Sequence, residues 1–157
     1  VSVFRQICTG FKLLNNKKVL LLYESKDIVY NNFCKHLIHN NISILQDKVD
    51  EYNKIIYTNK VIDNVKSNCL YITDNTNKFN LDMYIGLCDY VFLPNSKYSL
   101  YNQNLIDIAL EYGKDILVIP GNVYEDNTFF NNYLIKNGAI CITSKQELLD
   151  IVKDKTY

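Results

Sequence analysis

Glycine, arginine and histidine are scarce in this chain, and each shortage argues against a class of functional site. The 157 residues include five glycines and contain neither a Gly-x-Gly-x-x-Gly pattern nor a Walker-type phosphate loop. We therefore expect no glycine-rich backbone cradle for a dinucleotide. Arg5 is the only arginine, although bidentate recognition of phosphate or guanine usually falls to that side chain. The only histidines are His36 and His39, which confines any histidine chemistry to one segment.

Charge and hydrophobic content are typical of a single folded domain. Lys+Arg and Asp+Glu number 17 each, and this balance argues against a strongly polyanionic partner as the default. Hydrophobic residues make up 48% of the chain and charged residues 22%, which suits a substantial core. We expect one domain over residues 1–157, with residues 1–16 as a leading helix or the remnant of a preceding module.

The five cysteines are scattered, odd in number and without a Cys-x-x-Cys spacing. We expect reduced, mostly buried thiols in a cytoplasmic protein. No signal peptide is visible and no apolar run approaches the length of a membrane span, so no membrane association is expected. His36 and His39 lie three positions apart, but no third ligand accompanies them, so we expect no metal site.

Short apolar runs alternate along the chain with segments of helical periodicity. Because the runs are continuous rather than alternating, they predict a parallel sheet that is covered on both faces. The predicted fold is a Rossmann-like three-layer α/β/α sandwich with a mostly parallel sheet. Predicted strands lie at 19–23, 42–45, 53–58 (a weaker one), 69–73, 89–94, 115–121 and 139–143. Predicted helices lie at 27–41, 60–68, 80–87, 104–113, 129–138 and 144–153.

In such sheets the ligand crevice lies outside the carboxyl ends of the strands. Glu24 and Asp74 follow two predicted strands, where a carboxylate can act as a base, bind a ribose hydroxyl or simply cap a helix. Pro120-Gly121 stops a third strand, either as a tight turn or as a close approach to a ligand. Four clusters should share this edge: 23–25, 73–75, 94–96 and 120–122.

From Gly86 onward the chain reads "GLCDYVFLP", "ALEYGKDILVIPG" and "NNYLIKNGAICITSKQELLDIV", with gapless spacing to Ser144. This order resembles the DNA-processing protein A family (DprA, also called Smf). In that family a Gly-Leu-Ser segment, a helix ending Ala-Leu-Glu-x-Gly-Arg, a strand closing in Pro-Gly and a Gly-x-Asn-x-Leu-Ile-x-x-Gly-Ala segment follow one another. The resemblance covers about the C-terminal half of the chain and implies the same Rossmann-like fold.

Several family motifs are replaced in this sequence. The family has Gly-Ser-Arg where only Ser25 and Lys26 correspond, and its Arg-Asn-Arg becomes Asn80-Leu81-Asp82. Its Ser-Gly-Ser loop becomes Leu100-Tyr101-Asn102, and Phe130 replaces the glycine before Asn132. In the family these glycines and arginines line a positively charged pocket for single-stranded DNA. The losses therefore fall on the parts that contact phosphate, whereas the parts that build the sheet are kept.

The resemblance implies a protein that binds single-stranded DNA and assists loading of a RecA-type recombinase during DNA uptake and recombination. It implies no enzymatic activity and no cofactor, and it makes a homodimer a further expectation. Lys26 would contact phosphate, and Tyr23, Tyr98 and Tyr101 would stack on bases. The candidate DNA-binding residues are Ser25, Lys26, Asn95, Ser96, Gly121, Asn122 and Asn132.

Two alternatives stay open at this stage. Related Rossmann-like folds bind nucleotides or cleave nucleoside monophosphates at the same edge, but their Pro-Gly-Gly-x-Gly-Thr loop is replaced here by "LPNSKYSLYNQN". A degenerate module that keeps only a protein-interaction role is the other alternative.

Overall fold

A computed structural model describes residues 16–23, 27–46, 51–52, 55–58, 69–73, 80–125 and 129–153. Parts of the sequence-based predictions fall outside these ranges: the leading helix, the helix at 60–68, and the residues Glu24, Ser25, Lys26 and Asp74.

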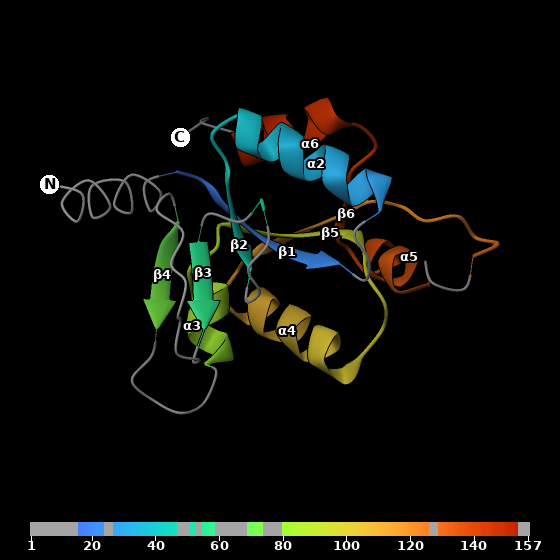
Figure 1. The fold of residues 1–157 in the computed structure, drawn as a ribbon. Coiled ribbons are helices and arrows are strands. Elements are labelled where there is room, and N and C mark those ends of the chain that lie inside the picture. Colours follow the sequence, from blue (N-terminus) through green and yellow to red (C-terminus); the bar gives the residue numbers. More distant parts are fainter. Residues whose placement is uncertain are drawn as a thin grey trace, which may run out of the picture.

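Within the described residues, seven strands form one sheet in which every recorded pairing is parallel. The sheet order is β4-β3-β2-β1-β5-β6-β7 (Figure 1). The strands are β1 (Lys18–Tyr23), β2 (Ser43–Gln46), β3 (Ile55–Thr58), β4 (Leu70–Thr73), β5 (Tyr90–Asn95), β6 (Asp115–Val118) and β7 (Ile140–Cys141).

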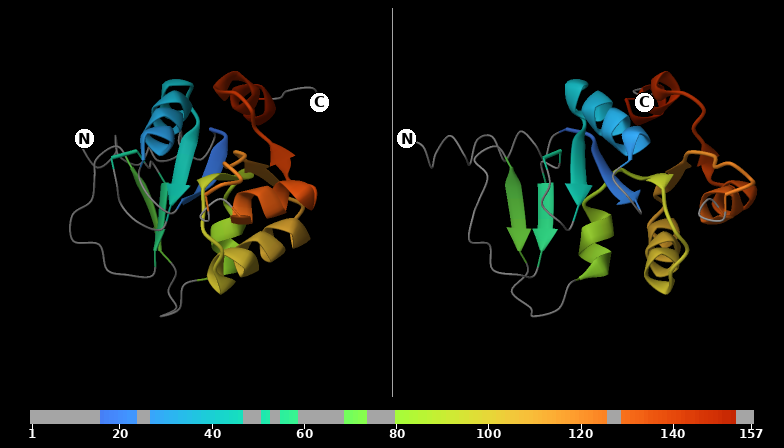
Figure 2. Two further views of the ribbon diagram at one scale, coloured as in Figure 1. Left: turned by 90° about the vertical axis from the view of Figure 1, so that its right-hand side faces the viewer. Right: turned by 45° about the vertical axis from the view of Figure 1, so that its right-hand side comes forward.

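The described helices cover both faces of the sheet, so the predicted three-layer fold is confirmed (Figures 1 and 2). One face carries α2 and α6, and the other carries α3, α4 and α5. Their bounds are α2 (Ile28–His39), α3 (Leu81–Gly86), α4 (Leu100–Glu111), α5 (Phe129–Lys136) and α6 (Lys145–Val152).

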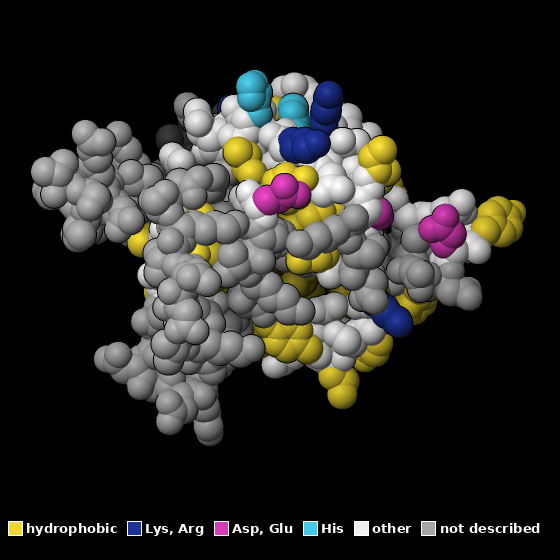
Figure 3. All heavy atoms as spheres, viewed as in Figure 1, with side chains coloured by type: hydrophobic (Ala, Val, Ile, Leu, Met, Phe, Trp, Pro, Cys, Tyr) yellow, Lys and Arg dark blue, Asp and Glu magenta, His cyan; other side chains and the backbone are white. Residues whose placement is uncertain are grey.

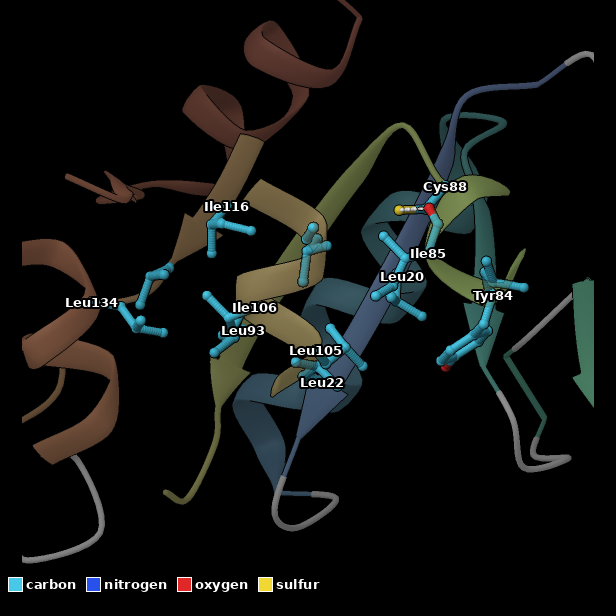
Figure 4. Packing of buried hydrophobic residues seen from close by; sticks show 14 of the residues in the cluster. Leu20, Leu22, Tyr84, Ile85, Cys88, Leu93, Leu105, Ile106, Ile116 and Leu134 are labelled. Carbon is cyan, nitrogen blue, oxygen red and sulfur yellow. Dashed lines mark hydrogen bonds between the residues drawn. The ribbon is translucent and has the colours of Figure 1, made fainter. Parts of the chain in front are cut away.

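Alternate side chains of each buried strand supply the two separate cores. In β1, Leu20 and Leu22 pack with α3, α4 and α5, whereas Val19 and Leu21 pack with α2 and α6. Figure 4 shows Leu20 and Leu22 on the side of the sheet that faces Leu105 of α4. This two-sided burial is why the strand sequences read as continuous apolar runs.

Helix starts follow the expected capping chemistry. The Asp27 carboxylate accepts from the backbone N–H of Tyr30, and the Ser144 hydroxyl accepts from that of Glu147, which is the usual capping role of Asp and Ser. Helix α4 begins at Leu100, four residues earlier than predicted, because the Ser99 side chain caps it by accepting from the Asn102 N–H.

Two helices end next to a glycine, near the predicted ends, whereas the last strand is shorter than predicted. Gly113 (φ +71°) and Gly138 (φ +106°) occupy the left-handed region just beyond α4 and α5, where a side chain would be strained. Strand β7 pairs only at Ile140 and Cys141 instead of over 139–143. None of the described helices is long and apolar enough to cross a membrane.

The cysteines of the described chain are free thiols in two kinds of environment. Cys34 and Cys88 are buried, whereas Cys69 and Cys141 are half-buried. The Cys88 thiol donates to the Ile85 carbonyl oxygen at 3.0 Å. Burial, partly offset by Lys114, raises the pKa of the Cys88 thiol to about 11.

Because the thiolate is the reactive form, Cys88 should resist alkylation in the folded protein. At about pH 8, mass spectrometry should show iodoacetamide on Cys69 and Cys141 well before Cys88. A folded pKa above the unfolded value also means that Cys88 favours folding below about pH 9 and that this contribution is lost as the pH rises toward 11. Labelling of native Cys88 as fast as Cys141 would contradict this assignment.

Candidate functional site at the carboxyl edge

The switch point of the sheet lies between β1 and β5. Strands β1 to β4 extend to one side of this point and β5 to β7 to the other, and the carboxyl ends of β1 and β5 pair at Tyr23 and Asn95. Parallel sheets of this kind bind ligands outside the strand ends at such a point. A binding site at this edge would therefore be formed by the loops after β1, β5 and β6.

The start of helix α2 at this edge already holds a negative charge. Asp27 uses one carboxylate oxygen to cap the helix and the other to accept from Nδ2 of Asn95 at 2.6 Å. Helix N-termini attract anions, but an incoming phosphate here would meet the Asp27 carboxylate. The α2 N-terminus is consequently a poor phosphate site.

Ser96 connects the ends of β1 and β5 rather than facing solvent. Its side chain is 2% exposed, and its hydroxyl donates to the Leu22 carbonyl oxygen at 2.8 Å. Its backbone N–H donates to Oδ1 of Asn131 at 3.3 Å. Both polar groups of Ser96 are thus used inside the protein, and its role is to fix where the β5–α4 loop leaves the sheet.

Asn131 of α5 links β5 to β6. It is 3% exposed, and besides accepting from Ser96 it donates from Nδ2 to the carbonyl oxygens of Leu93 (3.3 Å) and Ile119 (3.0 Å). The Leu93 carbonyl oxygen also accepts from the Ile119 N–H at 3.1 Å. The buried amide therefore adds to the last strand–strand bond at Leu93 and supplies bonds to Ser96 and Ile119 beyond it.

The neighbouring side chain, Asn132, holds the Pro-Gly exit of β6. Its Oδ1 accepts from the Gly121 N–H at 2.9 Å, and its Nδ2 donates to the Gly121 carbonyl oxygen at 3.1 Å. Pro120 has no N–H and cannot extend the ladder. The amide therefore pairs with the first residue beyond it, and the Pro-Gly sequence serves as a backbone exit that α5 holds in place.

Beyond Gly121 the chain makes an exposed turn. Oδ1 of Asn122 accepts from the Tyr124 N–H at 3.0 Å, and the Glu125 N–H donates to the Asn122 carbonyl oxygen. Asn122 thereby stabilises a loop tip that carries Val123 and Tyr124 into solvent.

Large aromatic side chains are exposed along the loops at this edge. We call four of them the edge aromatics, and their exposed fractions are Tyr98 51%, Tyr101 46%, Tyr124 92% and Phe129 65%. They come from the β5–α4 and β6–α5 connections and the first turns of α4 and α5. Tyr98 is partly supported by an edge-to-face contact with buried Phe130, at 5.8 Å between ring centroids.

Tyr23, the third tyrosine nominated for stacking, is placed differently. Its ring lies 4.4 Å from that of Tyr30, and it packs against the core beneath α2. It contributes to packing, whereas exposed Tyr98 and Tyr101 have surface to offer a ligand.

The charge at the described part of this edge is modest. Lys97 is exposed between Ser96 and Tyr98, and its backbone carbonyl oxygen accepts from Nδ2 of Asn102. Asp27 and Glu125 are exposed acids of the same loops. The described edge is thus an apolar aromatic surface with few charges.

Five of the seven nominated residues are described, and the sheet brings their loops to one edge. Asn95, Ser96, Gly121 and Asn132 use their polar groups to shape the edge, and Asn122 forms the exposed turn. Sequence reasoning missed Asn131, Lys97 and Tyr124. The signal for Asn131 was a polar residue one turn before Leu134 on the apolar face of a predicted helix.

Two cavities formed by described residues lie away from this edge. One, of about 280 Å³, is bounded by the last turns of α4 and α5 and includes Leu110, Asp115 and Asn137. The other lies between α2 and α6.

Among the described residues, no group of three or more His, Cys, Asp or Glu is placed to hold a metal ion.

The fold is similar to that of solved DprA structures. The DprA from Helicobacter pylori, described for its mode of binding single-stranded DNA, superposes with a TM-score of 0.70 at 17% identity over 90% of this chain and 82% of its own. The DprA from Streptococcus pneumoniae gives 0.69 at 18% identity over 94% of this chain. This chain covers 65% of the pneumococcal protein. The predicted resemblance to DprA is confirmed for the fold.

Molybdenum cofactor proteins share the architecture at lower similarity. The cofactor-binding protein from Rippkaea orientalis gives a TM-score of 0.61 at 11% identity, over 88% of this chain and 96% of its own. The carrier protein from Chlamydomonas reinhardtii gives 0.60 at 9% identity, with the same coverage. No protein-family model and no curated protein sequence matches the chain.

Replacement of Asn131 by alanine should destabilise the protein markedly. The substitution leaves the Ser96 N–H and the Ile119 carbonyl oxygen without the partner described here, while the Leu93 carbonyl oxygen keeps only the Ile119 N–H. We expect a loss of about 3 kcal/mol in urea unfolding. Asn132→Ala should cost about 1 kcal/mol, since water can reach half-buried Gly121.

Asn137→Ala is the matched control, because exposed Asn137 follows α5 and its side-chain amide donates to the Tyr133 carbonyl oxygen of the last turn. An Asn131→Ala loss no larger than that of the control would show that Asn131 does not hold the edge together.

Proposed function

We propose that this protein binds single-stranded DNA at the carboxyl edge of its sheet, as a DprA-like domain. The observation that carries the proposal is the gathering of exposed aromatic rings on the loops around the switch point. The fold similarity to a DprA described for single-stranded DNA binding supports it. We expect no bond-making chemistry, because binding of this kind needs none.

Stacking is the recognition chemistry that suits this edge. Flat rings such as Tyr98 and Tyr124 can stack on any base, at about 1–3 kcal/mol per base. Single-stranded DNA presents unpaired bases, whereas the bases of a duplex are covered by their neighbours. The Asn-held loops keep the backbone in place, so that little ordering is needed when a strand binds.

Phosphate contacts should contribute less than in a strongly basic site. Lys97 is the exposed lysine of the described edge, and we propose Lys26 as its partner across the switch point. Two such contacts predict that the logarithm of the association constant falls with the logarithm of salt concentration at a slope of roughly −1.4. Such a weak dependence of affinity on salt is expected when base stacking contributes more to binding than phosphate contacts do.

The proposal extends by resemblance to a cytoplasmic role in DNA uptake and recombination, with assistance to a RecA-type recombinase and formation of a homodimer. DNA binding is the first requirement of that role. A second candidate function is binding of a nucleotide or other small molecule at the same edge. The similarity of the fold to that of molybdenum cofactor proteins supports this candidate.

Titration of labelled oligo-dT at low and moderate salt tests the main proposal. We expect a Kd between about 1 and about 100 μM, weakened at least about fivefold by Tyr98→Ala and by Tyr124→Ala. Tyr112→Ala is the control, because Tyr112 is about as exposed as Tyr98 but lies at the opposite end of α4.

Each outcome of this titration separates the candidates. Equal affinities of the wild type and the Tyr98 and Tyr124 variants would place DNA elsewhere on the molecule. Absence of oligo-dT binding with salt-insensitive binding of a nucleotide would favour the small-molecule function, and absence of both would leave a protein-interaction module.

A further inference from the structure

A second surface, far from the edge aromatics in the fold, carries a concentration of positive charge. Helices α2 and α6 lie side by side on one face of the sheet (Figures 1 and 2). Histidine and lysine side chains gather over them in Figure 3. Between the helices lies an open cleft of about 580 Å³, lined by Asn32, Lys35, His36, His39 and Lys145.

Nothing in the lining of this cleft balances its charge. Its lining contains no carboxylate, and within the described residues no hydrogen bond or ion pair engages the side chains of Lys35, His39 or Lys145. The acids of α6 are held within their own helix region: Glu147 accepts from the Thr143 hydroxyl and Asp150 from Nε2 of Gln146. Like charges held together without counter-charges favour an anion as ligand.

His36 contributes a half-buried ring to the lining of the cleft. Its Nε2 atom is buried without a hydrogen-bond partner. Burial first, and then the charges of Lys145, His39 and Lys153, lower the pKa of His36, while the Lys145 backbone acts in the opposite direction. These surroundings disfavour the protonated ring, and an anion in the cleft would offset part of that effect.

The donor set suits a phosphate group better than a metal ion. The two histidines lie three positions apart on α2, but flanking Lys35 and Lys145 repel cations, and the described residues place no third metal ligand beside them. Ammonium and imidazole N–H groups converging from two helices match the several acceptor oxygens of a phosphate. Lys145 also begins α6.

We propose that the cleft between α2 and α6 binds a phosphate group, carried either by a small phosphorylated molecule or by a nucleic-acid backbone. The site uses Lys35, His36, His39 and Lys145. It is independent of the proposed DNA binding at the carboxyl edge, since it shares no residue with it.

Proton uptake should accompany binding. A bound anion stabilises protonated His36, so affinity rises as the pH falls from about 8 to about 5. The charged and titratable groups near His36 are Lys35 and His39 on α2, Lys145 at the start of α6 and Lys153 just beyond its end. Of these, Lys153 donates to Oδ1 of Asn40 and does not line the cleft.

Calorimetric titration with sodium sulfate at constant ionic strength is the first test, because the charge of sulfate stays constant over this pH range. Lys35→Gln and Lys145→Gln should each weaken sulfate binding about tenfold. Lys136→Gln is the control, since Lys136 is an exposed lysine on α5, across the sheet. Absence of saturable binding, or equal weakening by the control, would overturn the proposal.

Competition distinguishes the two phosphate sources. A nucleoside 5′-monophosphate and an oligo-dT without terminal phosphate are each added to the sulfate complex of Tyr98→Ala, which lacks an edge aromatic. Displacement by the monophosphate alone assigns a small ligand, and displacement by oligo-dT assigns a DNA backbone. If neither displaces sulfate, the assignment to phosphate is wrong.

Discussion

One buried amide determines the shape of the carboxyl edge. Where β5 and β6 leave the sheet, Asn131 makes three hydrogen bonds to their backbone groups, two of them at Ser96 and Ile119 and one beside the Ile119–Leu93 bond. Ser96 extends the connection to β1, and Asn132 extends it to Gly121. The loops that carry the edge aromatics begin at these fixed points. Their positions therefore depend on the first turn of α5.

This construction changes the chemistry that the edge can offer. Phosphate sites in related architectures use glycine-rich loops and helix N-termini, but here the α2 N-terminus is filled by the Asp27 carboxylate. Side-chain amides hold the loops, and exposed rings replace charge as the accessible surface. The proposed DNA binding accordingly relies on stacking. The basic cleft between α2 and α6 then stands as a separate electrostatic feature.

Much of the fold was predictable from the sequence. Strands that are buried on both faces have continuous apolar sequences, and helix caps such as Asp27 and Ser144 can be recognised from neighbouring residues. The arrangement of side chains at the carboxyl edge was less predictable. Ser96 and Asn132 were nominated as ligand-facing residues, yet their partners lie 74 and 11 positions away. Such pairings depend on tertiary structure, which no local pattern contains. Asn131 was overlooked because its one local signal, a position on the same helix face as Leu134, does not reveal that its partners are backbone groups of β5 and β6.

Amide chemical-shift mapping with oligo-dT tests the central claim most directly. In ¹⁵N-labelled protein, the largest perturbations should fall on residues 95–101, 119–124 and 129–133, which surround the edge held by Asn131. Perturbations confined to α2, α6 or the amino ends of the strands, with those three segments unchanged, would contradict the account.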